Sequence, residues 1–341
     1  MEYGKDELMV ILIITFGFML TVFVLVKKRR ITCPFIYKAS SGHIYSIATY
    51  ITTNPLSVDM NKVRQIELSN KHKLPVPLQM MADPFVIKEK GDFYIFYEEL
   101  TQKKYAKGAD IAVLQSHDGL QWKRMGIALR EPFHLSFPNV FLYQGEYYML
   151  PEVAACGEMR IYKAVGFPMK WKKYSVILAG KSYSDPMVYI QDDYIYIWYH
   201  TYLDGDELRL IYAKDINGPW KEHPKSPIRT NGNDCRPAGT INTIDNKLYY
   251  FVQNHSEGYG TGVIAYKINK LSPIEYEDEC LEDNPLLWKN GDSWARDGMH
   301  QYSMVKYNDK EWLCVMDGRR GITQSAWKWN WRNWPILYMK I

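Results

Sequence analysis

A strand pattern repeated about every 50 residues constrains this 341-residue chain more than any other feature. Each copy begins with a short polar or proline-containing step. It continues as an apolar run, turns at polar residues, and ends as an aromatic run. The five copies begin at Ala82, Ser136, Ser184, Cys235 and Met299. Successive prolines in the first four copies are 54, 48 and 51 residues apart; these are Pro84, Pro138, Pro186 and Pro237.

Each copy reads as a β-hairpin, because two alternating apolar runs flank a short polar turn. A second strand pair follows three of the copies and ends on a tryptophan each time: Trp122, Trp171 and Trp220. A lone four-stranded sheet cannot bury both faces, whereas five such sheets packed radially can. The sequence therefore predicts an all-β, five-bladed propeller over residues 81–341. A β-sandwich is the main competing fold, but it does not explain the period or the tryptophan at a constant phase.

The N-terminal segment predicts a membrane anchor. Residues 9–26 carry no charge, and the run Lys27-Lys28-Arg29-Arg30 follows at once. No small-residue cleavage site follows this run, so we expect an uncleaved spanning helix over about 9–26 within an anchor of residues 1–30. A buried core helix is the alternative. Residues 31–80 would form a linker and the segment that closes the ring.

Charge and cysteine usage bear on location and partners. The basic run predicts a single-pass protein whose globular part is cytoplasmic, and five scattered cysteines, read as free thiols, agree. The near balance of 42 basic and 38 acidic residues argues against nucleic-acid binding. No common metal, phosphate-loop or nucleophile motif occurs, so we expect neither a metal nor a cofactor, and His300 alone is weak evidence for a cation.

Polar residues at matched phase predict a site on the propeller axis. In a propeller, the residues that start the innermost strands face the channel mouth. Here they are Asp83, Phe137, Asp185, Arg236, and either His300 or Gln301. Further polar residues lie near the strand ends and in adjoining loops: Glu98, Glu152, His134, His200, Gln253 and His255. An aspartate before proline can simply initiate a turn, but different chemistries at one repeated position favour a pocket.

Carboxylates and amides satisfy sugar hydroxyls, and tyrosine and tryptophan stack on the apolar faces of sugars. The chain is rich in both kinds of residue, with 27 tyrosines and 11 tryptophans. We therefore expect the ligand to be a glycan or a glycolipid headgroup.

Several strings resemble a known family. They include ADPFV (82–86), HLSFPNVF (134–141), YMLPE (148–152) and RPAG (236–239). Together they are similar to the N-terminal domain of plant glucosamine inositolphosphorylceramide transferases and bacterial relatives. Aspartates that open blades one and three also resemble the five-bladed propellers of glycoside hydrolase family 43. The plant enzymes carry a separate C-terminal glycosyltransferase domain, for which this chain has no room. The resemblance thus implies a separate glycosyltransferase as a partner.

The hydrolase resemblance implies catalytic roles. Those propellers use a base aspartate on blade one, a tuning aspartate on blade three and an acid glutamate on blade four. Asp83 and Asp185 match the first two, whereas Arg236 stands where the glutamate is expected. Arginine cannot donate a proton near neutral pH but can clamp an anion. We therefore expect Glu98 or Glu152 to donate the proton.

The remaining site residues are expected to bind the substrate: His134, Arg236, Gln253, His200 and His300. The first functional hypothesis is an enzyme that transfers or cleaves a glycosidic bond on a glycan or glycolipid headgroup, with an anionic ligand favoured by Arg236. A non-catalytic glycan-binding module is the second. A membrane-tethered propeller that binds another protein is the third, since a fold alone does not decide function.

Overall fold

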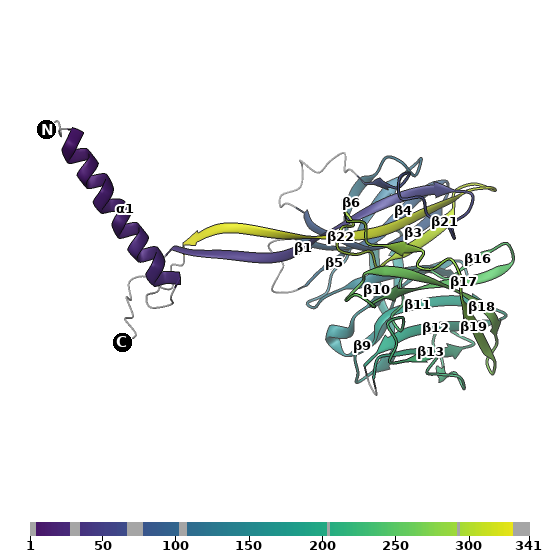
Figure 1. Cartoon of the computed structure of the whole chain (residues 1–341). Coiled ribbons are helices and arrows are strands. Elements are labelled where there is room, and N and C mark those ends of the chain that lie inside the picture. Colours follow the sequence, from purple (N-terminus) through teal and green to yellow (C-terminus); the bar gives the residue numbers. More distant parts are fainter. Residues whose placement is uncertain are drawn as a thin grey trace. The chain divides into compact units, whose positions relative to one another are not determined.

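This computed structural model describes residues 5–27, 35–66, 78–101, 108–202, 205–291 and 294–329. The chain divides into two compact units, Met1–Gly42 with Ile322–Ile341, and His43–Gly321. The first unit contains helix α1 (Lys5–Lys27; Figure 1), along which large apolar side chains such as Ile14, Phe16 and Phe18 are exposed. Within the described residues, no helix combines the length and the apolar character needed to span a membrane. The anchor therefore stays a prediction from the sequence.

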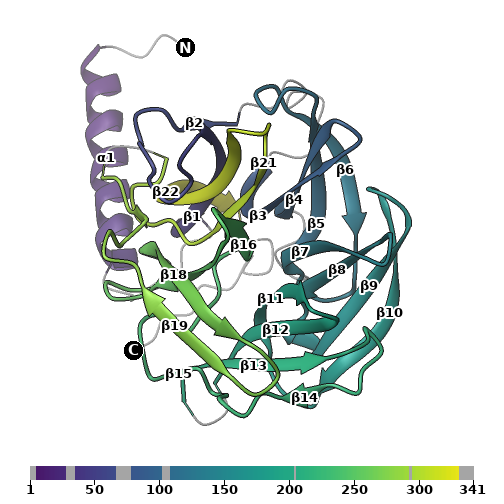
Figure 2. The same cartoon turned by 90° about the vertical axis from the view of Figure 1, so that its right-hand side faces the viewer.

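In the part of the chain that the structure describes, the strands form one eight-stranded, one four-stranded and two five-stranded sheets. Figure 2 shows these sheets arranged around a common axis, and the eight-stranded sheet holds two of the five propeller blades. Blade one contains β3 (Leu78–Glu89), β4 (Asp92–Thr101), β5 (Asp110–Ser116) and β6 (Lys123–Leu129). Blade two contains β7 (Ser136–Tyr143), β8 (Glu146–Glu152), β9 (Glu158–Gly166) and β10 (Lys170–Ala179), with the 3₁₀ turn η3 (Ala154–Cys156) between β8 and β9. Blade three contains β11 (Ser184–Gln191), β12 (Tyr194–Thr201), β13 (Glu207–Ala213) and β14 (Lys221–Glu222).

Blade four contains β16 (Asn242–Ile244), β17 (Lys247–Asn254), β18 (Gly262–Leu271) and β19 (Tyr276–Cys280). Two short strands, β15 (Arg229–Thr230) and β20 (Leu287–Trp288), add to β13 and β18. Blade five contains β21 (Tyr302–Lys306), β22 (Trp312–Trp329), β1 (Phe35–Thr52) and β2 (Arg64–Gln65). Neighbouring strands within a blade are antiparallel wherever register is defined, which agrees with the hairpins predicted from the repeat.

The two ends of the propeller sequence meet in blade five. Its sheet order is β21–β22–β1, so an N-terminal strand completes a sheet that C-terminal strands begin. β1 also pairs in parallel with β3 of blade one, with Tyr45 opposite Met80. Of the predicted closing segment 31–80, strands β1 and β2 thus lie in the ring, while Leu74–Pro77 falls outside the described residues. Strand β22 is described as far as Trp329.

A core cluster fills each contact between neighbouring blades, because both faces of an inner blade must be covered. Blades three and four, for example, pack Trp198 against Tyr250, with ring centroids 6.4 Å apart. Trp122, one of the tryptophans that recur at a constant phase of the repeat, is 2% exposed. It packs in the core cluster between blades five and one.

The backbones of blades four and five approach each other closely at Gly239. It has a φ of +148°, and a Cβ there would lie 1.6 Å from the Tyr302 carbonyl oxygen. Gly239→Ala should lower the free energy of unfolding by more than about 3 kcal/mol, because backbone must move. Gly91→Ala controls for positive φ in open space, and Gly291→Ala for the added methyl alone. Thermal unfolding measures all three, and a Gly239→Ala protein as stable as Gly91→Ala would refute the clash.

Candidate functional site

The inner strands of blades one to three begin with the same unusual backbone. Asp83, Phe137 and Asp185 have φ values of 51°, 46° and 48°, respectively, in the left-handed region, although none is glycine, and a proline follows each. The register with the second strand shifts at the same place in each hairpin. Such a conformation costs about 1–3 kcal/mol per residue, so neighbouring contacts must hold it.

Carboxylates from the preceding blade supply those contacts. Asp317 Oδ2 of blade five accepts the Asp83 N–H at 3.1 Å. Asp83 Oδ2 of blade one accepts the Phe137 N–H at 3.0 Å. Glu152 Oε2 of blade two accepts the Asp185 N–H at 3.1 Å. Three acidic side chains therefore fasten consecutive blades to each other around the axis.

Blades three and four are joined by an ion pair instead. Asp185 Oδ2 accepts hydrogen bonds from Arg236 Nε and, at 3.0 Å, from Gln253 Nε2. Arg236 also lies 3.5 Å from Glu152 Oε2. Burial would raise the pKa of Asp185, but the Arg236 charge, together with hydrogen bonds to Glu152 and Arg236, outweighs burial and the pKa is lowered. Burial, then the Asp185 charge, raises the pKa of Glu152 well above its usual value, so these two neighbouring carboxyl groups are shifted in opposite directions.

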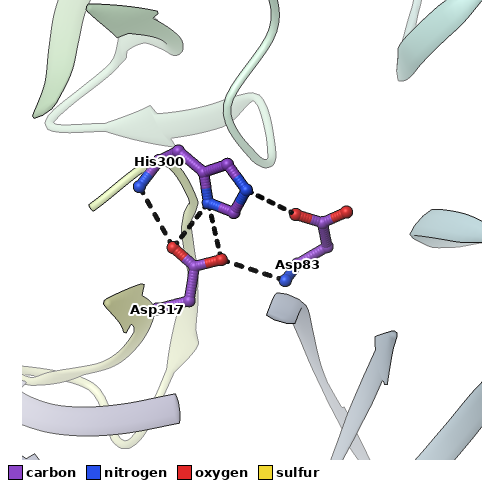
Figure 3. A group of neighbouring side chains, drawn as sticks. All are labelled: Asp83, His300 and Asp317. Carbon is purple, nitrogen blue, oxygen red and sulfur yellow. Dashed lines mark hydrogen bonds and ion pairs between the residues drawn. The ribbon is translucent and has the colours of Figure 1, made fainter. Parts of the chain in front are cut away.

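His300 lies between two carboxylates (Figure 3). Its Nδ1 is 2.8 Å from Asp317 Oδ1, and its Nε2 is 3.5 Å from Asp83 Oδ1. Burial opposes protonation of His300, but Asp317 prevails and raises its pKa. Burial raises the pKa of Asp83 to about 7, although His300 acts against this shift. The donor atoms of Asp83, His300 and Asp317 lie within 4.8 Å of one another and could hold a cation, but a protonated imidazole competes with one.

Glu98 differs from the other acidic residues. Its Oε1 is buried without a hydrogen-bond partner among the described residues, and His134 Nε2 lies 3.5 Å away. His134 Nδ1 accepts the Ala109 N–H at 3.1 Å, so a neutral His134 carries its proton on the nitrogen that faces Glu98. Burial, then the Asp83 charge, raises the pKa of Glu98 well above its usual value. The environment of Glu98 thus favours its neutral form, and Glu98 does not fasten the ring.

The structure brings all nine predicted site residues to this cluster. His200 is fully buried, its Nε2 contacts Asp206, and burial lowers its pKa. Gln253 connects Asp185 to His255, whose Nε2 is 2.9 Å from Gln253 Oε1. Sequence reasoning missed Asp317. In the sequence it stands at the end of the aromatic run of copy five, as Glu98, Glu152, His200 and Gln253 stand near the ends of theirs, and alignment of those runs could have found it.

Asp83 should make stability depend on pH. Its folded pKa of about 7 lies above the ordinary 3.8, so protonation stabilises the fold fully below pH about 4, and this contribution is lost as pH rises to about 7. Asp83→Asn cannot ionise, so its unfolding free energy should fall less than that of the wild type between pH 4.5 and 8. Urea denaturation measures the difference, with the exposed Asp283→Asn as the control. Equal pH slopes in Asp83→Asn and wild type would rule the shift out.

Comparison with known proteins places this chain in a family. Residues 61–319 match the family described as Glucosamine inositolphosphorylceramide transferase 1, N-terminal. The protein of that name from Arabidopsis thaliana is 30% identical over 299 residues, which cover 81% of this chain and 39% of the relative. The protein from Oryza sativa subsp. indica is 31% identical over 256 residues, which cover 72% and 34% respectively. The chain therefore spans little more than a third of the length of these relatives.

Two solved structures share the fold. The α-L-arabinofuranosidase from Podospora anserina in complex with cellotriose has a TM-score of 0.52 and 10% identity, covering 78% of this chain and 95% of that one. A mutant α-L-arabinanase from Cellvibrio cellulosa has a TM-score of 0.50 and 14% identity, covering 76% and 95%. Because the family match spans most of the chain, the resemblance read from the sequence is confirmed, and the chain belongs to the glucosamine inositolphosphorylceramide transferase 1 N-terminal family.

Proposed function

We propose that the polar residues around Asp83, Asp185 and His300 at the propeller axis, called the axial cluster below, act on a glycan or a glycolipid headgroup. Their chemistry would be acid–base catalysis at a glycosidic bond. One observation carries the proposal: neighbouring buried carboxyl groups differ in protonation. The pKa values of Glu98 and Glu152 are raised, that of Asp83 is about 7, and that of Asp185 is lowered. Environments that separate the pKa values of paired acids are typical of acid–base sites.

The contacts assign roles within the cluster. Asp83 is half ionised near neutral pH and would take the proton from the attacking hydroxyl or water. Glu98 would donate a proton to the leaving oxygen, because its acid is neutral and its Oε1 has no hydrogen bond within the described residues. Glu152 is a weaker donor, because it faces Asp185 and already accepts the Asp185 N–H. Asp185, which is paired with Arg236, would favour the protonated form of Glu152.

The relatives suggest the ligand. Their name describes a transferase that acts with glucosamine and inositolphosphorylceramide, and we extend a headgroup of that kind to this chain. Arg236 is less available to bind an anionic headgroup than its sequence position implied, because Asp185 already balances its charge. Glycosyl transfer and glycosidic cleavage would both use Asp83 as the base and Glu98 as the acid.

A second candidate is a glycan-binding module without catalysis. The hydrogen bonds that tie Asp83, Glu152 and Asp317 to the next blade favour it, because they give these acids a structural role. Such a module would present the headgroup to a separate glycosyltransferase.

Turnover separates the two candidates. The full chain would be incubated with glucosamine-bearing glycans and inositolphosphorylceramide, and products followed by mass spectrometry. Asp83→Asn and Glu98→Gln should each slow product formation by about 10²–10⁴-fold, because a base or an acid is lost. Asp283→Asn should not. Product formation unchanged in both variants would exclude the catalytic roles, and saturable binding without any product would leave the binding module.

We also propose that α1 anchors the chain in a membrane with the basic run on the cytoplasmic side. The uncharged stretch 9–26 and the exposed apolar side chains of α1 support this. The full chain should then stay in the membrane pellet after alkaline carbonate extraction, and protease added to sealed cells should leave residues 43–321 intact. Release by carbonate would contradict the anchor, and cleavage would contradict the orientation.

A further inference from the structure

Half-buried arginines in this propeller mostly pair with carboxylates. Those within 4.0 Å of an acidic oxygen are Arg124, Arg160, Arg209, Arg229 and Arg236. Arg319 on β22 differs. In the described part of the chain it forms no ion pair, and its Nε is buried without a hydrogen-bond partner. A guanidinium whose charge no protein group balances is a candidate for an anionic ligand.

Arg319 lies beside the axial cluster. Its Nη2 donates to the Tyr259 carbonyl, and its guanidinium carbon is 5.7 Å from the centroid of the Tyr259 ring. The Tyr259 ring is in turn 5.4 Å from His300. Gly260 permits this approach, because a Cβ there would lie 2.8 Å from the His300 Cβ. The loop before β18, which contains Tyr259 and Gly260, thus contacts both Arg319 and His300.

Two tyrosines surround the same place. Tyr45 of β1 lies 5.3 Å from His300 by ring centroids, on a strand that precedes the 61–319 family match. Burial raises the pKa of the Tyr45 hydroxyl, and the Asp317 charge raises it further, whereas the Arg319 charge lowers it. Tyr259 is 41% exposed although its neighbours are charged. Exposed aromatic rings beside polar groups are suited to stack on the apolar face of a sugar or polyol.

We propose that Arg319 binds an anionic group, phosphate or carboxylate, on a sugar or polyol whose ring rests against Tyr45 and Tyr259. The inference rests on the proposed function, because it names the part of the headgroup that this site selects. Arg236, predicted from the sequence to clamp an anion, is replaced in that role by Arg319, because Arg236 already forms an ion pair with Asp185.

Calorimetric binding to the full chain in detergent tests the assignment. The probes are glucosamine, glucosamine 6-phosphate, glucuronate and inorganic phosphate. At least one acidic sugar should bind roughly tenfold to hundredfold more tightly than glucosamine, because a charge-assisted hydrogen bond forms. Arg319→Gln should remove that preference while glucosamine still binds, and Arg319→Lys should keep part of it. Arg296→Gln, at an exposed arginine paired with Asp297, should keep it all.

The aromatic part has its own variants. Tyr45→Leu and Tyr259→Leu keep apolar bulk but remove the ring, so both should weaken every sugar probe and leave inorganic phosphate unaffected. Tyr174→Leu, at a tyrosine 39% exposed on β10, is the matched control. Tighter binding of glucosamine 6-phosphate identifies a phosphoryl headgroup, and tighter binding of glucuronate an acidic glycan. Both outcomes support the proposal.

Three results would overturn it. They are no acidic preference in the wild type, a preference unchanged in Arg319→Gln, or inorganic phosphate that binds as tightly as the sugar phosphate. Failure of the proposed function is seen separately. Asp83→Asn should lose turnover but keep the acidic preference, so turnover that survives in Asp83→Asn contradicts the catalytic roles and leaves the Arg319 assignment intact.

Discussion

The ring depends on a hydrogen bond from a strained backbone N–H to a carboxylate of the neighbouring blade. The acceptors are the carboxyl groups of Asp317, Asp83 and Glu152. In each case the N–H that donates belongs to a non-glycine residue at positive φ. A hydrogen bond contributes about 0.5–1.5 kcal/mol, and up to about 3 kcal/mol where the acceptor is ionised, which is comparable to the cost of the strained residue. The geometry at the mouth of the axis therefore persists only while blades and carboxylates stay in register.

This use of carboxylates divides the acidic cluster by role. Glu152 is held in place by the N–H it accepts and by Asp185, whereas Glu98 has a protonated acid and an oxygen without a partner in the described chain. Asp83 belongs to both groups, because one oxygen fastens blade two and the other faces His300. A group that stabilises the ring and also changes protonation near neutral pH couples any chemistry at the axis to the fold itself.

The repeat made much of this predictable. Matched spacing located the blades, and matched phase located the polar residues at the starts and ends of inner strands. Asp317 was missed because copy five lacks the proline that marks the other copies, so its second strand was not aligned with theirs. Tyr45 could not be found from the period, because it reaches the axis through ring closure by an N-terminal strand. Tyr259 lies in a loop, where no periodicity applies.

Charge pairing was the part that sequence could not supply. Arg236 was predicted near the axis, whereas nothing in the repeat singled out Arg319, and only three-dimensional neighbours tell the two cations apart. Arg236 is balanced by Asp185 from the adjacent blade, 51 residues earlier in the chain. Arg319 follows Asp317 by two residues on the same strand, yet Asp317 is committed to His300 and to the Asp83 N–H. The same hydrogen bonds that hold the ring together thus leave the Arg319 guanidinium beside the axis without an ion-pair partner among the residues that the structure describes.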